Sequence, residues 1–408
     1  MQRWLKFAKY LPHHNWTPVI FTPSNPSYSL QDTSLLSDIG PELEVIKTPI
    51  WEPYDLASIF KRQGQAAALN TGQTNKSGRS SQLLNWIRGN FFIPDPRKFW
   101  VKPSVKYLQN YLRDNPADAI VTTGPPHSMH LIGLGLKQSL DIKWLVDIRD
   151  PWSSFDLLDE YNISSRNLEK YKEMETAVLA ACDGVIATSP SMSKQLRPFD
   201  TTKFRAITNG YDKDDFRHYQ DKRADDELVL YHAGLMSGLR NPTHLWTALD
   251  KLITDKHLGH RALRLHLVGV IESAVQTSID EHPALSQHYL RQPYKKHDLV
   301  IYDYQQAHIL LLFVNNTANA KVNIPGKTFE YLATGKPILC FSDPDTDVAK
   351  ILSEMEHCLV VDYNLDSEVL VQQLITFFLA LKASSQQKIS QFSRAHLTSI
   401  LAEVLDQL

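Results

Sequence analysis

The sequence predicts an α/β protein built from two doubly wound domains, each a parallel sheet with helices on both faces. Short apolar runs rich in β-branched residues alternate with helical patterns along most of the chain. Continuous apolar runs of this kind are typical of strands that are buried on both faces. The chain is also longer, at 408 residues, than one ordinary core accommodates.

The strand-like runs form two series that are separated by one polar, turn-rich segment, residues 209–226. We therefore expect a first domain over 1–208, a linker over 209–226 and a second domain over 227–384. A C-terminal helix at about 385–408 would pack back on the first domain. Ligands are expected in a cleft at the carboxyl ends of the strands. The runs are 17–22, 43–48, 119–124, 144–150, 184–189 and 204–208, then 227–234, 263–270, 308–314, 337–341 and 358–363.

The chain opens on a helical pattern rather than on a strand. Trp4, Leu5, Ala8 and Leu11 would share one face of an amphipathic helix, and the lysines scattered among them exclude a signal peptide. Because a doubly wound domain ordinarily opens on a strand and a glycine-rich turn, we expect both to be missing here. Residues 64–81 are poor in bulky apolar side chains and predict a mobile loop.

Overall composition excludes several classes of protein. The formal net charge of −2 gives no case for nucleic-acid binding, and no apolar run approaches the roughly 20 residues that span a bilayer. Three widely spaced cysteines, Cys182, Cys340 and Cys358, lack the spacing of metal ligands. They indicate reduced thiols in a cytoplasmic protein.

Charge is nevertheless concentrated in one segment. Residues 61–113 hold ten basic residues and one acid, Asp95, and aromatic residues are mixed among them. Two interpretations stay open. The segment is either a solvated helical region with a few core aromatics, or a surface that meets anionic lipid headgroups or a lipid-phosphate acceptor. The second interpretation would make the protein peripheral at the inner face of the plasma membrane.

A Gly-Lys-Thr triplet, Gly326 to Thr328, enters a helical pattern and raises the question of a P-loop. A P-loop needs a glycine five positions before Gly326, where this chain has Lys321. Pro325 also removes an amide that the phosphate cradle would use. We therefore exclude a P-loop.

The same triplet still predicts an anion site at a helix start. Pro325 suits the first turn of a helix, and the free amides after Gly326 carry the positive end of the helix dipole. Lys327 adds a charge that the dipole by itself disfavours, so an anionic ligand would compensate it. The alternative is a surface ion pair between Lys327 and Glu330. Gly335 is expected to end the helix.

A second site of this kind follows the strand-like run 227–234. Gly234 lies in the turn, and Arg240, Asn241 and Pro242 open the next helical pattern. A solvated turn arginine is the alternative for Arg240. Two cations at helix starts, both at carboxyl ends of strands, indicate a diphosphate clamp.

Together with Asn209, Gly210, Asp212 and Phe216, these stretches resemble the retaining, nucleotide-sugar-dependent glycosyltransferases of family 4. Residues 121–137 and 144–152 resemble the N-terminal half of the exopolysaccharide and O-antigen branch. The resemblance implies the GT-B fold, two Rossmann-like domains with an interdomain cleft, and no cofactor or metal.

The resemblance also implies roles for residues in the second domain. Glu330 would bind the ribose hydroxyls. The donor diphosphate would be held by Arg240, Gly326, Lys327 and Thr328, and Gly234 and Gly269 would lie under the nucleotide. The chain departs from the family pattern at two positions: Val322 replaces the first of two glutamates, and Leu235 replaces an arginine.

In the first domain, two polar groups follow consecutive strand-like runs. His127 lies after a Gly-Pro-Pro turn, and it is either an acceptor-side catalytic residue or a structural histidine. Asp147 and Asp150 have the spacing of a metal pair, but we expect no metal, and Asp150 is interpreted as a helix N-cap or a catalytic contact to the acceptor.

These features predict transfer of a sugar from a nucleoside diphosphate sugar to a glycan or lipid-linked acceptor in surface polysaccharide biosynthesis. The alternatives are a nucleotide-sugar epimerase and a catalytically inactive nucleotide-sugar-binding protein.

Overall fold

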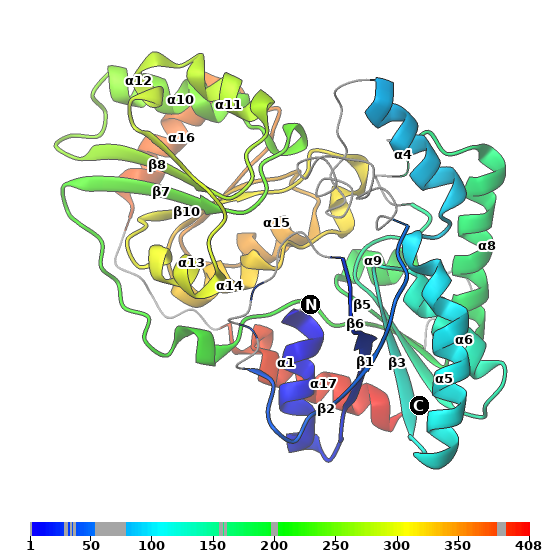
Figure 1. Cartoon of the computed structure of the whole chain (residues 1–408). Helices are drawn as coiled ribbons and strands as arrows, with labels where there is room; N and C mark the ends of the chain where they lie inside the picture. Colours follow the sequence, from blue (N-terminus) through cyan, green and yellow to red (C-terminus); the bar gives the residue numbers. More distant parts are fainter. Residues whose placement is uncertain are drawn as a thin grey trace. The chain divides into compact units, whose positions relative to one another are not determined.

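The computed structural model describes residues 2–27, 32, 35, 38–53, 79–154, 158, 161–196, 203–381 and 389–408. It divides into two compact units (Figure 1). Unit 1 comprises Met1–Thr208 with Thr398–Leu408, and unit 2 comprises Asn209–Leu397. Most of the loop predicted over 64–81 lies outside the described residues. Within the described residues, no helix is both long and apolar enough to cross a membrane.

Unit 1 contains two parallel sheets. One pairs β1 (Val19–Pro23) with β2 (Glu44–Thr48). The other has the order β3-β4-β5-β6, so its strands follow one another as they do in the sequence. Those strands are β3 (Ala119–Gly124), β4 (Lys143–Ile148), β5 (Gly184–Ala187) and β6 (Phe204–Ala206).

Helices cover both faces of the four-stranded sheet. The helices α6 and α8 lie together on one side, and α1 and the C-terminal helix α17 lie on the other (Figure 1). The helices are α1 (Gln2–Tyr10), α4 (Arg79–Phe91), α5 (Val101–Asp114), α6 (Ser128–Lys137), α8 (Ser165–Ala181), α9 (Pro190–Gln195) and α17 (Arg394–Asp406), with 3₁₀ turns η1 (Leu11–His14) and η3 (Pro96–Trp100).

The buried face of α1 differs from the predicted one. Phe7 and Ala8 are buried, but so are Arg3 and Lys6, whereas Trp4 and Leu5 are only half-buried. Arg3 and Lys6 can be buried because each has a carboxylate partner: Asp147 for Arg3 at 3.1 Å and Asp38 for Lys6 at 2.8 Å. The apolar pattern alone could not reveal these ion pairs.

Unit 2 is built on a six-stranded parallel sheet in the order β12-β11-β10-β7-β8-β9. The chain runs outward from β7 to β9, returns to β10 beside β7, and runs outward again to β12. A polar edge strand, β9, was not predicted, because its four residues lack an apolar run. The strands are β7 (Glu227–Ala233), β8 (Ala262–Val268), β9 (Tyr289–Gln292), β10 (Ile309–Phe313), β11 (Ile338–Phe341) and β12 (Cys358–Val361).

The return from β9 to β10 places helices on both faces of this sheet, as a doubly wound fold requires. One core lies under α10, α11, α12 and α16, and the other lies under α13, α14 and α15. The helices are α10 (Thr243–Thr254), α11 (Ser273–Asp280), α12 (Pro283–Ser286), α13 (His297–Tyr304), α14 (Lys327–Thr334), α15 (Asp347–Ser353) and α16 (Ser367–Leu379), and the 3₁₀ turns are η4 (Lys213–Phe216), η5 (Gly238–Arg240), η6 (Ala318–Val322) and η7 (Ser390–Phe392).

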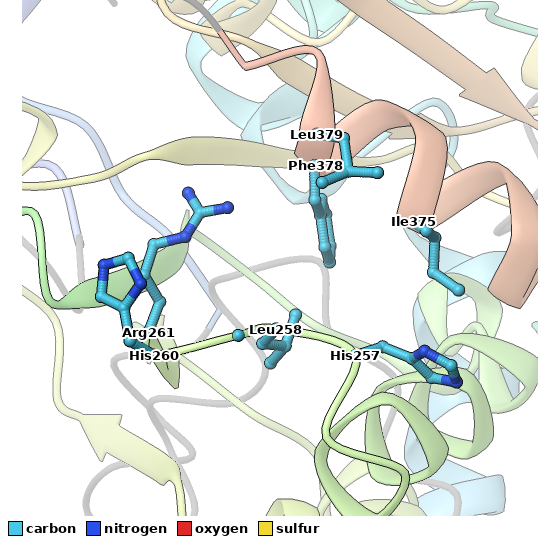
Figure 2. A pocket seen from close by; sticks show the side chains of 8 residues that line it. His257, Leu258, His260, Arg261, Ile375, Phe378 and Leu379 are labelled. Carbon is cyan, nitrogen blue, oxygen red and sulfur yellow. The ribbon is translucent and has the colours of Figure 1, made fainter.

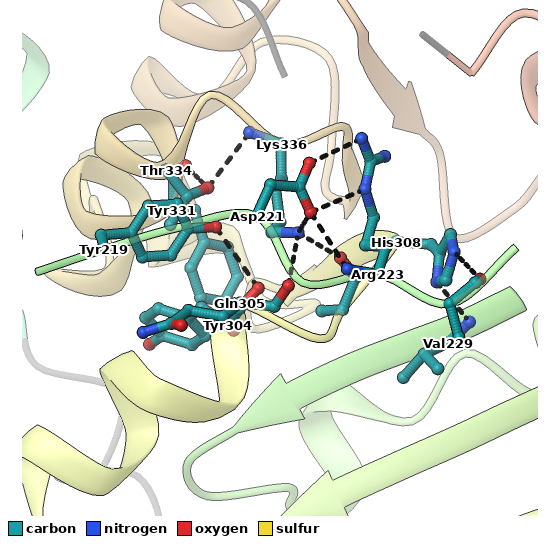
Figure 3. Close-up of polar contacts among 12 residues, drawn as sticks. Tyr219, Asp221, Arg223, Val229, Tyr304, Gln305, His308, Tyr331, Thr334 and Lys336 are labelled. Carbon is teal, nitrogen blue, oxygen red and sulfur yellow. Dashed lines mark hydrogen bonds and ion pairs between the residues drawn. The ribbon is translucent and has the colours of Figure 1, made fainter. Parts of the chain in front are cut away.

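The segment predicted as a linker, 209–226, is fastened to unit 2 by buried polar groups (Figure 3). The Lys336 side chain is fully buried, and its Nζ donates to Asp221 Oδ1 at 3.0 Å and to the carbonyls of Gln305 and Ala307 at 3.2 and 2.6 Å. Burial lowers the pKa of Lys336 to about 8, while the bond to Asp221 opposes this. His308 accepts from the amide of Val229 and contacts the Ala224 carbonyl.

Replacing this lysine should destabilise unit 2. Lys336→Ala leaves buried carbonyl oxygens without a donor, and we expect a loss of about 2–4 kcal/mol in the free energy of unfolding. Urea denaturation measures it. Lys350→Ala, at an exposed position of α15, is the matched control and should change stability by less than about 0.5 kcal/mol. Equal losses in the two variants would contradict the assignment.

Candidate functional site

The candidate site lies where the strand order of unit 2 reverses, at the carboxyl ends of β7 and β10. These two strands are neighbours, but the chain leaves them toward opposite edges of the sheet. Loops that leave in opposite directions open a crevice, and open α/β sheets bind ligands there. The predicted residues Gly234 and Arg240 follow β7, and Lys327 begins α14, which follows β10.

Lys327 reaches from α14 to the end of β7. Its Nζ donates to the Ala233 carbonyl at 2.6 Å and lies 3.5 Å from His232 Nε2. His232 is fully buried, and its Nδ1 pairs with the Leu311 carbonyl of β10 at 2.9 Å. Lys327 is therefore held over the boundary between the two central strands, and His232 is a site residue that the sequence analysis missed.

Two glycines permit this approach. Gly234 has φ +141°, and a Cβ there would lie 2.4 Å from Lys327 Nζ. Gly269, with φ +121°, lies so close to Gly234 that its Cβ would meet the Gly234 carbonyl oxygen at 2.4 Å. Gly269 therefore contacts the neighbouring loop backbone. Its predicted contact to a nucleotide stays a prediction.

Arg240 completes the cationic cluster. Its Nε donates to Asn315 Oδ1 at 2.5 Å, and Asn315 follows β10. Burial lowers the pKa of Arg240, and burial followed by the charge on Arg240 lowers the pKa of Lys327 to about 7. Burial, then the charge on Lys327, likewise lowers the pKa of His232. Positive groups therefore repel one another here, and no carboxylate among the described residues forms an ion pair with Lys327 or Arg240.

At the start of α14, the amides of Thr328 and Phe329 donate to the carbonyls of Pro325 and Gly326, at 3.0 and 3.3 Å. No side chain caps its N-terminus, and a Cβ on Gly326 would meet nothing within 4 Å. The Thr328 hydroxyl is fully buried, yet its Oγ1 has no hydrogen-bond partner among the described residues. Gly335 ends the helix in the left-handed conformation, as predicted, with φ +67°.

Glu330 does not pair with Lys327. Its Oε1 lies 3.1 Å from His297 Nε2, and Tyr304 Oη donates to its Oε2 at 3.5 Å. Its side chain is 16% exposed, so the carboxylate is accessible while two neighbours on α13 hold it. The sequence analysis missed His297 and Tyr304, because α13 comes before β10 in the chain. Val322, the departure from the family pattern, is buried in η6.

In unit 1 the predicted residues lie in two loops at the carboxyl ends of β3 and β4. The Arg149 amide donates to the Gly124 carbonyl at 2.9 Å and joins the loops. The His127 ring is buried and stacks on Trp152, with ring centroids 4.9 Å apart. Burial, followed by the proximity of His130 and Arg149, lowers the pKa of His127 well below its usual value. Its Nδ1 is buried without a hydrogen-bond partner among the described residues, and both the structural and the catalytic interpretation stay predictions.

Asp147 and Asp150 do not form a metal pair. Asp147 is fully buried, and Arg3, Trp4 and Thr123 donate hydrogen bonds to its carboxylate. Asp150 caps no described helix, which corrects that interpretation, and no described residue forms a hydrogen bond with its carboxylate. Burial raises the pKa of Asp150, against the opposite effect of Arg149. A contact to an acceptor stays a prediction.

A hollow in unit 2 lies elsewhere (Figure 2). It is lined by the turn His257–Arg261, which precedes β8, and by the last turns of α16, with Ile375, Phe378 and Leu379. This is the amino end of the strands, opposite the end where doubly wound sheets bind ligands. We therefore do not assign it to the site.

The charge on Lys327 should make stability depend on pH. Its pKa is lowered from 10.5 to about 7 in the folded protein. Between these values the unfolded chain binds more protons at this residue, so the wild type gains stability as pH rises through this window. Lys327→Met lacks this gain. The stability of the wild type relative to the variant should therefore increase from about pH 7 to about pH 10.

Urea denaturation at both pH values measures this difference. Lys350→Met in α15 is the matched control. If the free energies of unfolding of the wild type and Lys327→Met differ by the same amount at about pH 7 and about pH 10, the burial of Lys327 is contradicted.

Comparison with known proteins gives structural matches alone. No protein-family model matches the chain, and no curated protein matches it. Among solved structures, Anabaena Alr3699/HepE in complex with UDP and glucose has a TM-score of 0.59 at 14% identity, over 100% of this chain and 95% of that one. WaaG, a glycosyltransferase involved in lipopolysaccharide biosynthesis, has 0.56 at 12% identity, over 99% and 95%.

A putative UDP-N-acetylglucosamine 2-epimerase from Listeria monocytogenes is similar to the same degree. Its TM-score is 0.56 at 10% identity, over 99% of this chain and 92% of that one. Identities this low establish a shared fold and nothing finer. With its parallel sheets and reversed strand order, the chain has the GT-B fold of nucleotide-sugar glycosyltransferases.

Proposed function

We propose that this protein is a retaining glycosyltransferase that moves a sugar from a nucleoside diphosphate sugar to a glycan or lipid-linked acceptor in surface polysaccharide biosynthesis. The observation that carries the proposal is the cationic cluster at the switch point of unit 2. No described carboxylate forms an ion pair with Lys327 or Arg240, and the partly exposed Glu330 follows Lys327 by about one turn of α14.

The cluster matches the chemistry of a nucleoside diphosphate. Lys327 and Arg240 would hold the diphosphate near the N-terminus of α14, where the helix dipole attracts negative charge. The Thr328 hydroxyl, which is buried and has no hydrogen-bond partner in the described part of the chain, would donate to one of the diphosphate oxygens. The Glu330 carboxylate would accept hydrogen bonds from the ribose hydroxyls, in an orientation fixed by His297 and Tyr304.

The same groups would lower the barrier to transfer. The bond between the anomeric carbon and the phosphate oxygen breaks as a bond to the acceptor oxygen forms, and negative charge grows on the leaving diphosphate. Fixed positive groups stabilise that charge more in the transition state than in the bound donor. If the acceptor attacks from the phosphate's own face, configuration is retained, and the acceptor proton passes to the leaving oxygen. His127 and Asp150 are the acceptor-side candidates.

The second candidate is a nucleotide-sugar epimerase. The Listeria structure, which its title describes as a putative epimerase, matches this chain about as well as WaaG does. An epimerase would release a changed sugar or sugar nucleotide without any acceptor. Val322 and Leu235, which replace polar family residues, favour a third outcome in which the donor binds without turnover.

Labelled donors separate these functions. The full chain is incubated with UDP- and GDP-sugars, with and without glycan and lipid-linked acceptors, and the products are separated by chromatography. Transfer that requires an acceptor supports the proposal. Turnover without an acceptor identifies an epimerase or hydrolase, and binding without turnover identifies an inactive binding protein.

Variants test the donor site independently of turnover. Lys327→Ala and Glu330→Ala should each weaken donor binding by about tenfold or more, because each removes a charged hydrogen-bonding group worth roughly 1.5–3 kcal/mol. The nucleotide sugar that raises the melting temperature of the wild type is identified first, and isothermal titration calorimetry with it then measures the affinity of each variant. Lys350→Ala in α15 is the matched control, and thermal melting checks folding. Unchanged donor affinity in both site variants would overturn the assignment.

A further inference from the structure

An exposed cluster of aromatic rings lies on the surface of unit 1. We call it the aromatic patch, and its exposed members come from three separate segments: the stretch after β2, the end of α4 and η3. Phe91 is 59% exposed and Trp51 49% exposed, which is unusual for side chains of this size. The patch consists of Trp51, Trp86, Phe91, Phe92, Lys98 and Phe99.

The rings form two groups, which Lys98 links. Trp51 and Phe99 meet edge to face at 4.9 Å between centroids, and Phe92 and Phe99 do so at 6.3 Å. Trp86 and Phe91 meet edge to face at 5.6 Å. Lys98 joins these groups, because its Nζ donates to the Phe91 carbonyl and lies over the rings of Phe92 and Phe99 at 5.7 and 5.3 Å.

Basic side chains extend the patch. Lys102 and Lys106 are exposed on successive turns of α5, which begins directly after η3. Burial, followed by the charge on Lys170 of α8, lowers the pKa of Lys98, so these two lysines repel each other. None of these four lysines forms an ion pair with a described residue. The region therefore presents lysines without ion-pair partners among the described residues, although the charge of Asp95 acts to raise the pKa of Lys98.

Two of the acids near this charge have partners inside the unit, and two others, on α8, are exposed. Asp95, the one acid between residues 61 and 113, accepts from the amide and hydroxyl of Ser128 at the start of α6. Glu52 is buried and pairs with Arg97 at 2.9 Å. On α8, Glu169 lies 3.8 Å from Lys172, and Glu173 is exposed. Among the described residues between 79 and 113, the one acid thus has partners inside the unit, while Lys102 and Lys106 are exposed.

We propose that the aromatic patch, with Lys102, Lys106 and Lys170, docks the protein on an anionic lipid bilayer. Tryptophan and phenylalanine enter the interface between headgroups and acyl chains, while lysines attract anionic headgroups. Single-stranded nucleic acid fits less well, because base stacking needs free ring faces. Here Lys98 covers the faces of Phe92 and Phe99, and the rings meet one another at their edges.

Vesicle flotation of the full chain tests this proposal, which does not depend on the proposed sugar transfer. Vesicles of phosphatidylcholine with about 30% phosphatidylglycerol should bind the protein, and vesicles of phosphatidylcholine alone should not. Added salt should weaken the binding, because it screens exposed charges. No flotation with anionic vesicles, equal flotation with neutral ones, or capture of an oligonucleotide in place of vesicles would overturn the proposal.

Two patch variants locate the binding surface. The first is a triple variant that combines Lys98→Gln, Lys102→Gln and Lys106→Gln. It should bind vesicles at least about tenfold more weakly, because each lysine near an anionic surface adds to the attraction. Trp51→Ser with Phe91→Ser should also weaken vesicle binding, with the charge unchanged. If the triple variant does not fold, as thermal melting would show, Lys102→Gln with Lys106→Gln replaces it.

The matched control removes the same charge from unit 2. Lys213→Gln, Lys256→Gln and Lys350→Gln combined alter three exposed lysines outside the patch. This control should bind vesicles like the wild type. An equal loss in the control and the triple patch variant would attribute binding to overall charge and overturn the proposal.

Discussion

The candidate donor site depends on the hydrogen bond from Lys327 to the Ala233 carbonyl, which joins the start of α14 to the end of β7. A lysine that starts one helix reaches the last residue of the neighbouring strand, and it can do so only because Gly234 has no Cβ in its path. His232 is held by β10 underneath, and Arg240 is held by Asn315 beside it. Positive groups withdrawn from water without an opposite charge are costly, and an anion that binds among them removes that cost.

In unit 1, the polar side chains at the carboxyl ends of the strands have different partners from those in unit 2. Asp147, at the end of β4, is fully buried and bound to Arg3, so the charge serves the attachment of α1 to the sheet. His127 stacks on Trp152, and Asp95 caps α6. Several buried polar atoms at this edge nevertheless have no hydrogen-bond partner among the described residues: His127 Nδ1, His130 Nε2, Arg149 Nε and Trp152 Nε1. Unit 2 differs in that two cations, Lys327 and Arg240, form no ion pair with a described carboxylate. An unmatched charge is the stronger indication of a ligand, because a folded chain otherwise neutralises its buried charges.

The basic surface of unit 1 also depends on which charged side chains have partners. The sequence places a strong excess of basic residues between 61 and 113, and that excess alone is compatible with a solvated helix or with a docking surface. In the described part of this segment, the one acid, Asp95, accepts a hydrogen bond from Ser128 at the start of α6, and Arg97 forms an ion pair with Glu52. Of the lysines that remain, Lys98 lies over the rings of Phe92 and Phe99, and Lys102 and Lys106 are exposed on the helix that follows.

Local features of the sequence determined the apolar strands, the doubly wound class and the ends of α14, because burial periodicity and helix capping act over a few residues, but they did not reveal the polar edge strand β9. Gly335 and Pro242 mark helix ends in the structure as they do in the sequence. The tertiary structure alone decided the partners of the charged groups. His297 meets Glu330 across 33 residues, Arg240 meets Asn315 across 75, and Arg3 meets Asp147 across 144. These pairs depend on the order of strands in a sheet and on which face a helix covers, and no short stretch of sequence encodes either one.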